Sequence, residues 1–281
     1  MSKKKILAAI LLASLPVFGF SQKNKQKEDT TAVIKEFMIV CNQYKTLPMH
    51  LSLKHSNSAA ISVSREDTAA MEADFFITEG GSYIRYGNTE QIVNDSLVLM
   101  VSLDQQVMML YPNKRNLRAQ LSSFMGLQMA DSSVLKMAAA YTSAVLPAQN
   151  ADKGIIELKN RSPLPGTDIV KEIITLTYNI KAKNPEQVVY IRRTLMPIDK
   201  SEWDSLPGHE EANVKLVKIK ESYFIVNERK AVFDYKEISH NAEIKLPVSI
   251  TDRITRNQLG EFVPAKGFQD YHLSMEESGL N

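Results

Sequence analysis

Short segments of alternating polarity, joined by tight links, constrain this chain more than any other feature of its sequence. From Met49 onward apolar residues recur at every second position, as at Leu51 and Leu53, and Gly80-Gly81 separates two such segments. A period of two is the spacing of a β-strand with one buried face. Parallel strands need long crossover connections, whereas antiparallel strands can be joined by tight turns. The sequence therefore predicts a long antiparallel meander.

The remaining elements follow from the same kind of spacing. Residues 72–78 and 82–86 predict a hairpin around the two glycines. Later strands are predicted over residues 155–159, 169–180, 187–195, 214–226 and 231–238, the last two joined by residues 227–230. Helical spacing predicts an amphipathic helix before Pro48, with an apolar stripe of Ile34, Phe37, Met38, Cys41 and Tyr44. It also predicts a helical insert over residues 116–147, whose second helix presents Val134, Met137, Ala138, Tyr141 and Val145.

The first 21 residues predict a secretory signal peptide. Lysines at positions 3–5 precede an apolar run, and Gly19 and Ser21 are small residues before the expected cut. The alternative is a membrane anchor, but the run contains Pro16 and is shorter than the roughly 17–25 residues of a spanning helix. We therefore expect a soluble periplasmic protein with no transmembrane anchor after processing. Residues 22–30 are expected to be a flexible lead-in, and residues 31–281 a single domain.

Charge and cysteine content narrow the possible partners. Removal of the signal peptide takes three of the 34 basic residues and none of the 32 acidic ones, so the mature chain is close to neutral. Such a chain has no electrostatic preference for nucleic acid or for an anionic membrane. Cys41 is the single cysteine, so no internal disulfide can form. Its apolar neighbours favour a buried core residue over a nucleophile.

One predicted hairpin, over residues 97–111, is apolar on both faces. A turn centred on Asp104-Gln105 pairs position 102 with 107, 100 with 109 and 98 with 111, and directly opposed residues share a face. One face then carries Leu97, Leu99, Val101, Leu103, Met108 and Leu110. The opposite face is apolar with some polar positions. A sheet of this kind must be covered on both sides, or must leave one side to a partner.

Two explanations fit these faces. In the first, the N-terminal helix covers one face and the insert covers the other. In the second, a curved sheet surrounds a hydrophobic cavity, and the six side chains just named bind the ligand. Methionine suits a surface that accepts variable apolar ligands, and Met100, Met108 and Met109 lie in this hairpin. Methionine also fills ordinary cores, so both explanations stay open.

The order of these elements resembles the periplasmic lipoprotein-carrier superfamily, which has the LolA/LolB-like fold. Residues 83–88, 92–95 and 110–112 carry the likeness most closely. The resemblance implies an α+β fold: a curved antiparallel β-sheet, or unclosed barrel, with the N-terminal helix and the helical insert packed on it. It also implies a cavity that binds acyl chains. The chain departs from the family in its length, and its insert and its tail after residue 247 have no clear counterpart.

No catalytic or metal-binding motif is recognisable, so we expect no enzyme activity, no cofactor and no metal site. His50 and His55 are five apart in a predicted strand and should point to opposite faces. Neither a glycine-rich phosphate loop nor a nucleophile elbow is present. The sequence therefore predicts a binding protein for a lipid or a lipoprotein acyl chain. The alternative is an envelope scaffold that has a filled core, contacts envelope proteins and holds no ligand.

Overall fold

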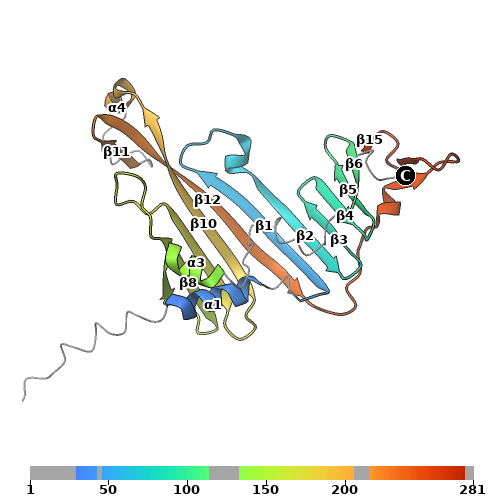
Figure 1. Ribbon diagram of the computed structural model, residues 1–281, viewed down its shortest axis with the longest axis horizontal. Helices are drawn as coiled ribbons and strands as arrows, with labels where there is room; N and C mark the ends of the chain where they lie inside the picture. The colour runs from blue at the N-terminus through green and yellow to red at the C-terminus, as the bar shows by residue number, and fades with distance from the viewer. Residues whose placement is uncertain (1–29, 43–45, 114–132, 206–214, 276–281) are drawn as a thin grey trace, which may run out of the picture.

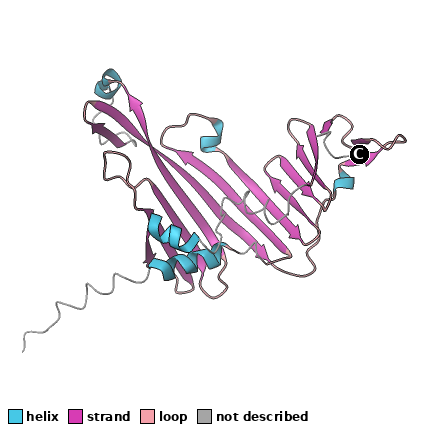
Figure 2. Cartoon of the chain, viewed as in Figure 1, coloured by secondary structure: helices cyan, strands magenta, loops and turns pink. Residues whose placement is uncertain are grey.

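The computed structural model describes residues 30–42, 46–113, 133–205 and 215–275. Within these residues the chain forms one open, thirteen-stranded sheet, with two helices packed at one end of it (Figures 1 and 2). The sheet does not close on itself, because β15 (His272–Met275) and β7 (Tyr141–Leu146) remain as its edges. The predicted α+β class, with an unclosed antiparallel sheet, an N-terminal helix and a helical insert, is confirmed.

The strand order follows from consecutive pairing. From edge to edge it is β15-β6-β5-β4-β3-β2-β1-β12-β10-β9-β8-β7, with β11 beside β12. The further strands are β1 (Met49–Ala59), β2 (Ala70–Thr78), β3 (Gly81–Tyr86), β4 (Thr89–Val93), β5 (Leu97–Ser102), β6 (Val107–Pro112), β8 (Lys153–Asn160), β9 (Glu172–Asn179), β10 (Pro185–Ile198), β11 (Lys215–Ile219) and β12 (Ser222–Ser239). Each strand from β1 to β5 pairs antiparallel with the next one in the chain, which is the predicted meander.

The hairpin of β5 and β6 has the predicted register. The opposed pairs include Ser102 with Val107, Met100 with Met109 and Val98 with Tyr111. Because opposed side chains share a face, the six predicted side chains do lie together on one side of the sheet. The glycine hairpin between β2 and β3 is also confirmed.

The register divides the sheet into two faces. We call helix-side the face on which α1 (Thr30–Cys41) and α3 (Ser133–Ala140) pack, and tail-side the face covered by residues 246–273. The buried stripe of α1, which includes Phe37, packs on Ile156 and Leu158 of β8 and on Leu176 of β9. Burial raises the pKa of the Cys41 thiol to about 12, so this residue is part of the core and is a poor nucleophile at neutral pH.

A second helix-side cluster lies in the middle of the sheet. It consists of Met49, Leu51, Leu53, Ala73, Phe75, Ile77 and Ile84, from β1, β2 and β3. Of the described residues that pack against it, Leu47 alone comes from outside the strands. The apolar surface of the helix-side face therefore extends well beyond the area that α1 and α3 cover.

The prediction for the second helix of the insert is partly wrong. Residues 114–132 lie outside the described residues. The helix ends at Ala140, and the following residues form β7, which pairs with β8. Val145, expected on the helix face, lies in this strand and is 57% exposed. Aromatic and β-branched residues such as Tyr141 and Thr142 favour strands, and pairing with β8 satisfies their backbone.

The predicted link over residues 227–230 is also wrong, because these residues lie inside the long strand β12. The turn that precedes β12 falls at Lys220-Glu221 instead, where Lys220 has a φ of 54°. Asn227 is buried, and its side-chain oxygen accepts a hydrogen bond from the backbone N–H of Ile61 at 3.1 Å. The Asn227 side chain, which suggests a loop, is here bonded by the segment that follows β1.

Truncation of α1 tests the helix-side core. Phe37→Ala should lower the free energy of unfolding by about 3–5 kcal/mol, because a large, fully buried side chain leaves a cavity. Ile39→Ala on the same helix is the matched control. Since Ile39 is 57% exposed, its change should stay within about 0.5 kcal/mol. Urea unfolding measures both, and equal losses for the two variants would contradict this packing.

Candidate functional site

The C-terminal tail covers the six-residue face of β5 and β6. It comprises η3 (Ile250–Asp252), β13 (Ile254–Arg256), β14 (Phe262–Pro264) and β15. Its packed side chains are Leu246, Val248, Ile250, Ile254, Phe262, Phe268, Tyr271 and Leu273. Within the described residues neither the N-terminal helix nor α3 of the insert packs on this face, contrary to that expectation. The tail, which has no regular periodicity, supplies the cover.

The six predicted side chains belong to one cluster with the tail. Leu99, Val101, Met108 and Leu110 are fully buried, while Leu97 and Leu103 are partly buried at its margin. The structure thus brings all six together on one apolar surface, which we call the tail-side patch. Their role in binding a ligand stays a prediction.

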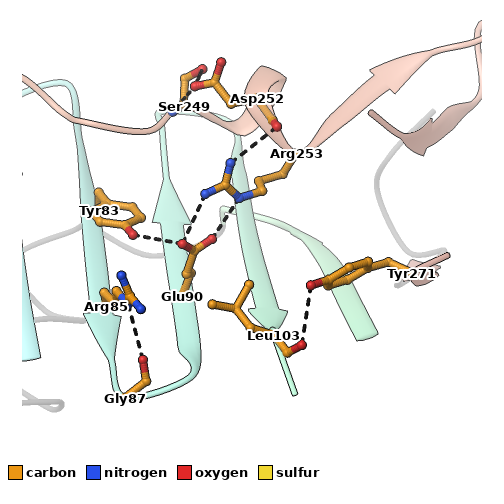
Figure 3. Close-up of polar contacts among 9 residues, drawn as sticks. All are labelled: Tyr83, Arg85, Gly87, Glu90, Leu103, Ser249, Asp252, Arg253 and Tyr271. Atoms are coloured by element: carbon orange, nitrogen blue, oxygen red, sulfur yellow. Dashed lines mark hydrogen bonds and ion pairs between the residues drawn. The ribbon is translucent and has the colours of Figure 1, made fainter. Parts of the chain in front are cut away.

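A buried ion pair fastens the tail to this face (Figure 3). Arg253 lies just after η3, and its Nε and Nη2 donate to the two carboxylate oxygens of Glu90 on β4 at 2.8 and 3.1 Å. Tyr83 on β3 donates its hydroxyl to the same carboxylate at 2.9 Å. The side chains of Glu90 and Arg253 are only 5% and 16% exposed. Such a bidentate arginine–carboxylate pair is a strong form of charged hydrogen bond.

The three groups fix one another's protonation states. Burial alone raises the pKa of the Glu90 carboxyl, but the hydrogen bonds from Arg253 and Tyr83 outweigh it and hold this pKa below its ordinary value. The bond to Glu90 raises the pKa of Arg253. Burial, together with the bond to Glu90, raises the pKa of Tyr83 to about 12. At neutral pH the cluster is therefore a charged pair with a neutral phenol.

Backbone and ring contacts hold the rest of the tail. β15 runs parallel to β6, and His272 donates its backbone N–H to the Gln106 carbonyl at 2.9 Å. The Arg253 guanidinium lies over the Phe268 ring at 4.7 Å. Tyr271 donates its hydroxyl to the Leu103 carbonyl at 3.4 Å (Figure 3). The tail is thus attached to the sheet at several points along its length.

Sequence reasoning did not find this attachment. Glu90 and Arg253 are 163 positions apart, and no local pattern links them. One signal was present: Glu90 occupies the same alternating face as Ile92 and lies opposite Val101, so it is a charged group at an apolar position. A buried carboxylate demands a partner.

The two histidines of β1 lie on opposite faces, as predicted. On the tail side His50 stacks on Phe76, with 4.1 Å between the ring centroids. On the helix side His55 stacks on Phe233, with 4.5 Å between the ring centroids. The described part of the chain contains no group of three or more His, Cys, Asp or Glu side chains that could hold a metal ion.

Comparison with known proteins finds weak structural similarity alone. No protein-family model matches the chain, and no curated protein matches it. A DUF1329 family protein from Desulfovibrio piger is similar in structure, with 10% identity and a TM-score of 0.30 over 77% of this chain and 95% of its own. A LolA superfamily protein from Nitrosomonas europaea shares 11% identity, with a TM-score of 0.23 over 78% of this chain and 94% of its own.

The LolA superfamily structure is among those that the chain resembles, as the sequence predicted. At these TM-scores the likeness supports no transfer of a ligand or a residue role. None of the helices within the described residues is both long and apolar enough to cross a membrane.

Acid should weaken the attachment of the tail. The pKa of Glu90 is lower in the folded chain than in the unfolded chain, where a glutamate titrates near about 4.3. Its stabilising contribution is present above the unfolded pKa and is lost as pH falls through the folded value. Urea unfolding should therefore show a steeper loss of stability below about pH 5 for the wild type than for Glu90→Gln. The exposed Glu243→Gln variant should keep the wild-type slope; an unchanged slope in Glu90→Gln would contradict this assignment.

Removal of the arginine should cost more than removal of both charges. Arg253→Met leaves Glu90 buried without its partner and should lower the free energy of unfolding by about 3–5 kcal/mol. The double variant Glu90→Gln with Arg253→Met should lose less, because no unpaired charge remains. Urea unfolding measures the totals, with Arg256→Met as control. If the double variant had a lower free energy of unfolding than Arg253→Met alone, the result would argue against a buried pair.

Proposed function

We propose that this is an exported periplasmic protein that binds a lipid or lipoprotein acyl chain on the tail-side patch, in place of the tail. The main support is the way this patch is closed. Its cover is a terminal segment fastened by an ion pair and a short parallel strand, and neither neighbouring strands nor α1 covers it. Such a segment can leave while the meander beneath it keeps its own hydrogen bonds.

The energetics of this exchange are plausible in size. Burial of acyl methylenes contributes roughly 0.8 kcal/mol each, so about ten of them contribute about 8 kcal/mol. The tail side chains that would be released are apolar as well, which makes the exchange a replacement of one apolar cover by another. The ligand would be held by shape and burial, since the six side chains of the patch offer no polar group.

A second function is favoured by one specific observation. Leu99, Val101, Met108 and Leu110 are fully buried against the tail, so this part of the molecule is a filled core. A protein with this core and no ligand would serve as an envelope scaffold that contacts other envelope proteins. The two functions differ in one property, which is whether the tail yields to a lipid.

Native mass spectrometry separates the two. The protein secreted into the periplasm of an expression host should carry adducts of lipid mass, and organic extraction should release them. Arg253→Met should carry more lipid, because its tail is held less firmly. A bare protein mass in both proteins, unchanged after incubation with lipids, would contradict lipid binding and favour the scaffold.

Variants at the margin of the patch test where the lipid lies. Leu97→Gln and Leu103→Gln should lower lipid occupancy several-fold with little loss of stability, because both side chains are only partly buried. Met109→Gln, in the same hairpin but on the opposite face, should leave occupancy unchanged. Lipid that persists in Leu97→Gln and Leu103→Gln would place the site elsewhere.

A further inference from the structure

A pocket of about 580 Å³ is lined by the end of β1, by β10, β11 and β12, and by the loop before β9. Figure 1 shows these strands on the opposite side of the molecule from the tail. Its floor is formed by tail-side positions of these strands, including Arg193 and Lys230, and one wall is formed by Ile169 and Val170 of the loop before β9. The volume lies within the range of small-ligand sites, about 300–1,000 Å³. Neither the tail nor any residue of the tail-side patch lines it.

The polar lining of this pocket has an excess of positive charge. Arg193, Lys215 and Lys230 line it together with a single acid, Glu228. Glu228 accepts a hydrogen bond from Arg193 Nε at 2.8 Å, and Arg193 Nη1 donates to the Val170 carbonyl at 3.0 Å. These two bonds fix the guanidinium and leave its Nη2 without a partner among the described residues. Fixed guanidinium donors suit phosphate and carboxylate groups.

The two lysines have no acidic partner in the described part of the chain. Most other lysines of the sheet do have one: Lys153 pairs with Glu186 and Lys236 with Glu72. Lys215 and Lys230 instead contribute uncompensated charge to a concave site. Concave walls of low polarity strengthen the local field, which raises the local concentration of anions.

Other walls of the pocket are apolar and are held in place by packing and by hydrogen bonds within the protein. Ile169 and Val226 are buried in one cluster with Leu164. The loop that carries Ile169 is closed on itself, since Leu164 donates its backbone N–H to the Ile169 carbonyl at 2.8 Å. Gly166 turns this loop with a φ of 73°, and a Cβ at this position would lie 2.8 Å from the Ile219 side chain.

An adjoining groove of about 640 Å³ shares Ile169 and Lys215 with the pocket. Its sides include Pro163, Leu164 and Val217, with Thr167 and Asp168 as polar members beside Lys215, so its lining is mainly apolar. Arg193 and Lys230 line only the pocket, whereas prolines and aliphatic side chains predominate in the groove, where Asp168 is the single acid among the lining residues. A ligand that matches this arrangement carries an anionic group on an apolar chain.

We propose that this pocket binds the anionic headgroup of a single-chain amphiphile, a phosphate or a carboxylate, with its chain in the adjoining groove. Arg193 orients the headgroup, and Lys215 and Lys230 attract it. This site is separate from the tail-side patch and does not depend on the function proposed for that patch. It would let the protein hold an amphiphile by its head at one end of the sheet.

Isothermal titration with dodecyl phosphate below its micelle concentration tests this site. The purified, delipidated protein should bind it, and Lys215→Gln and Lys230→Gln should each weaken binding about 5- to 10-fold, with a larger loss in the double variant. The exposed Lys266→Gln is the matched control and should bind as the wild type does. Binding should also weaken as NaCl is raised. Absence of binding, or full binding by the double lysine variant, would overturn the proposal.

Three further arms define the ligand. Dodecyl maltoside should bind at least 10-fold more weakly than dodecyl phosphate, and equal binding would overturn the role of the anion. Inorganic phosphate should bind at least 10-fold more weakly as well; equal binding would overturn the role of the chain and leave a free-phosphate site. Leu97→Gln with Leu103→Gln should keep wild-type affinity at this pocket. A loss there would instead assign the binding to the tail-side patch.

Discussion

An open sheet that is apolar on both faces is stable only if each face is covered, and this requirement organises the whole molecule. At one end α1 and α3 cover the helix side of β8 and β9. At the other end residues 246–273 cover the tail side of β3 to β6. The covers are thus placed on opposite faces at opposite ends. α1 and the tail are both remote in sequence from the strands that they cover, whereas α3 directly precedes β7 and β8.

The two covers differ in how they are held. α1 is joined to its surface by a buried apolar stripe and by a partly exposed ion pair between Glu36 and Lys183. The tail combines apolar contacts with a buried carboxylate–guanidinium pair between Glu90 and Arg253. Removal of one partner of such a pair leaves the other charge buried and unpaired, so the attachment is strong while both partners are present. Protonation of Glu90 removes the same charge complementarity, which makes the attachment of the tail sensitive to acid.

The sequence predicts much of this fold because the meander is local. Strands joined by tight turns reveal their period and their register, and the pairing of Met100 with Met109 follows from the turn alone. The stripe of α1 is readable for the same reason. The structure of the tail cannot be predicted from local sequence. Its short strands lie among prolines and glycines, and the residues that it contacts are far away in sequence. The sequence predicts a link at residues 227–230 because Asn227 and Glu228 are typical loop residues. In the structure Asn227 is bonded by Ile61 and Glu228 by Arg193, so the strand continues. The six residues of the tail-side patch were grouped correctly, but the segment that covers them is visible only in the structure.

The proposed function requires that a lipid and the tail compete for one apolar surface. Hydrogen–deuterium exchange of the protein with and without a synthetic palmitoylated lipopeptide measures this competition directly. Competition predicts faster exchange of the β15 and β13 amides when the lipopeptide is bound, with β1 to β4 unchanged. Slower exchange of the tail, or no change while the lipopeptide is bound, would contradict it.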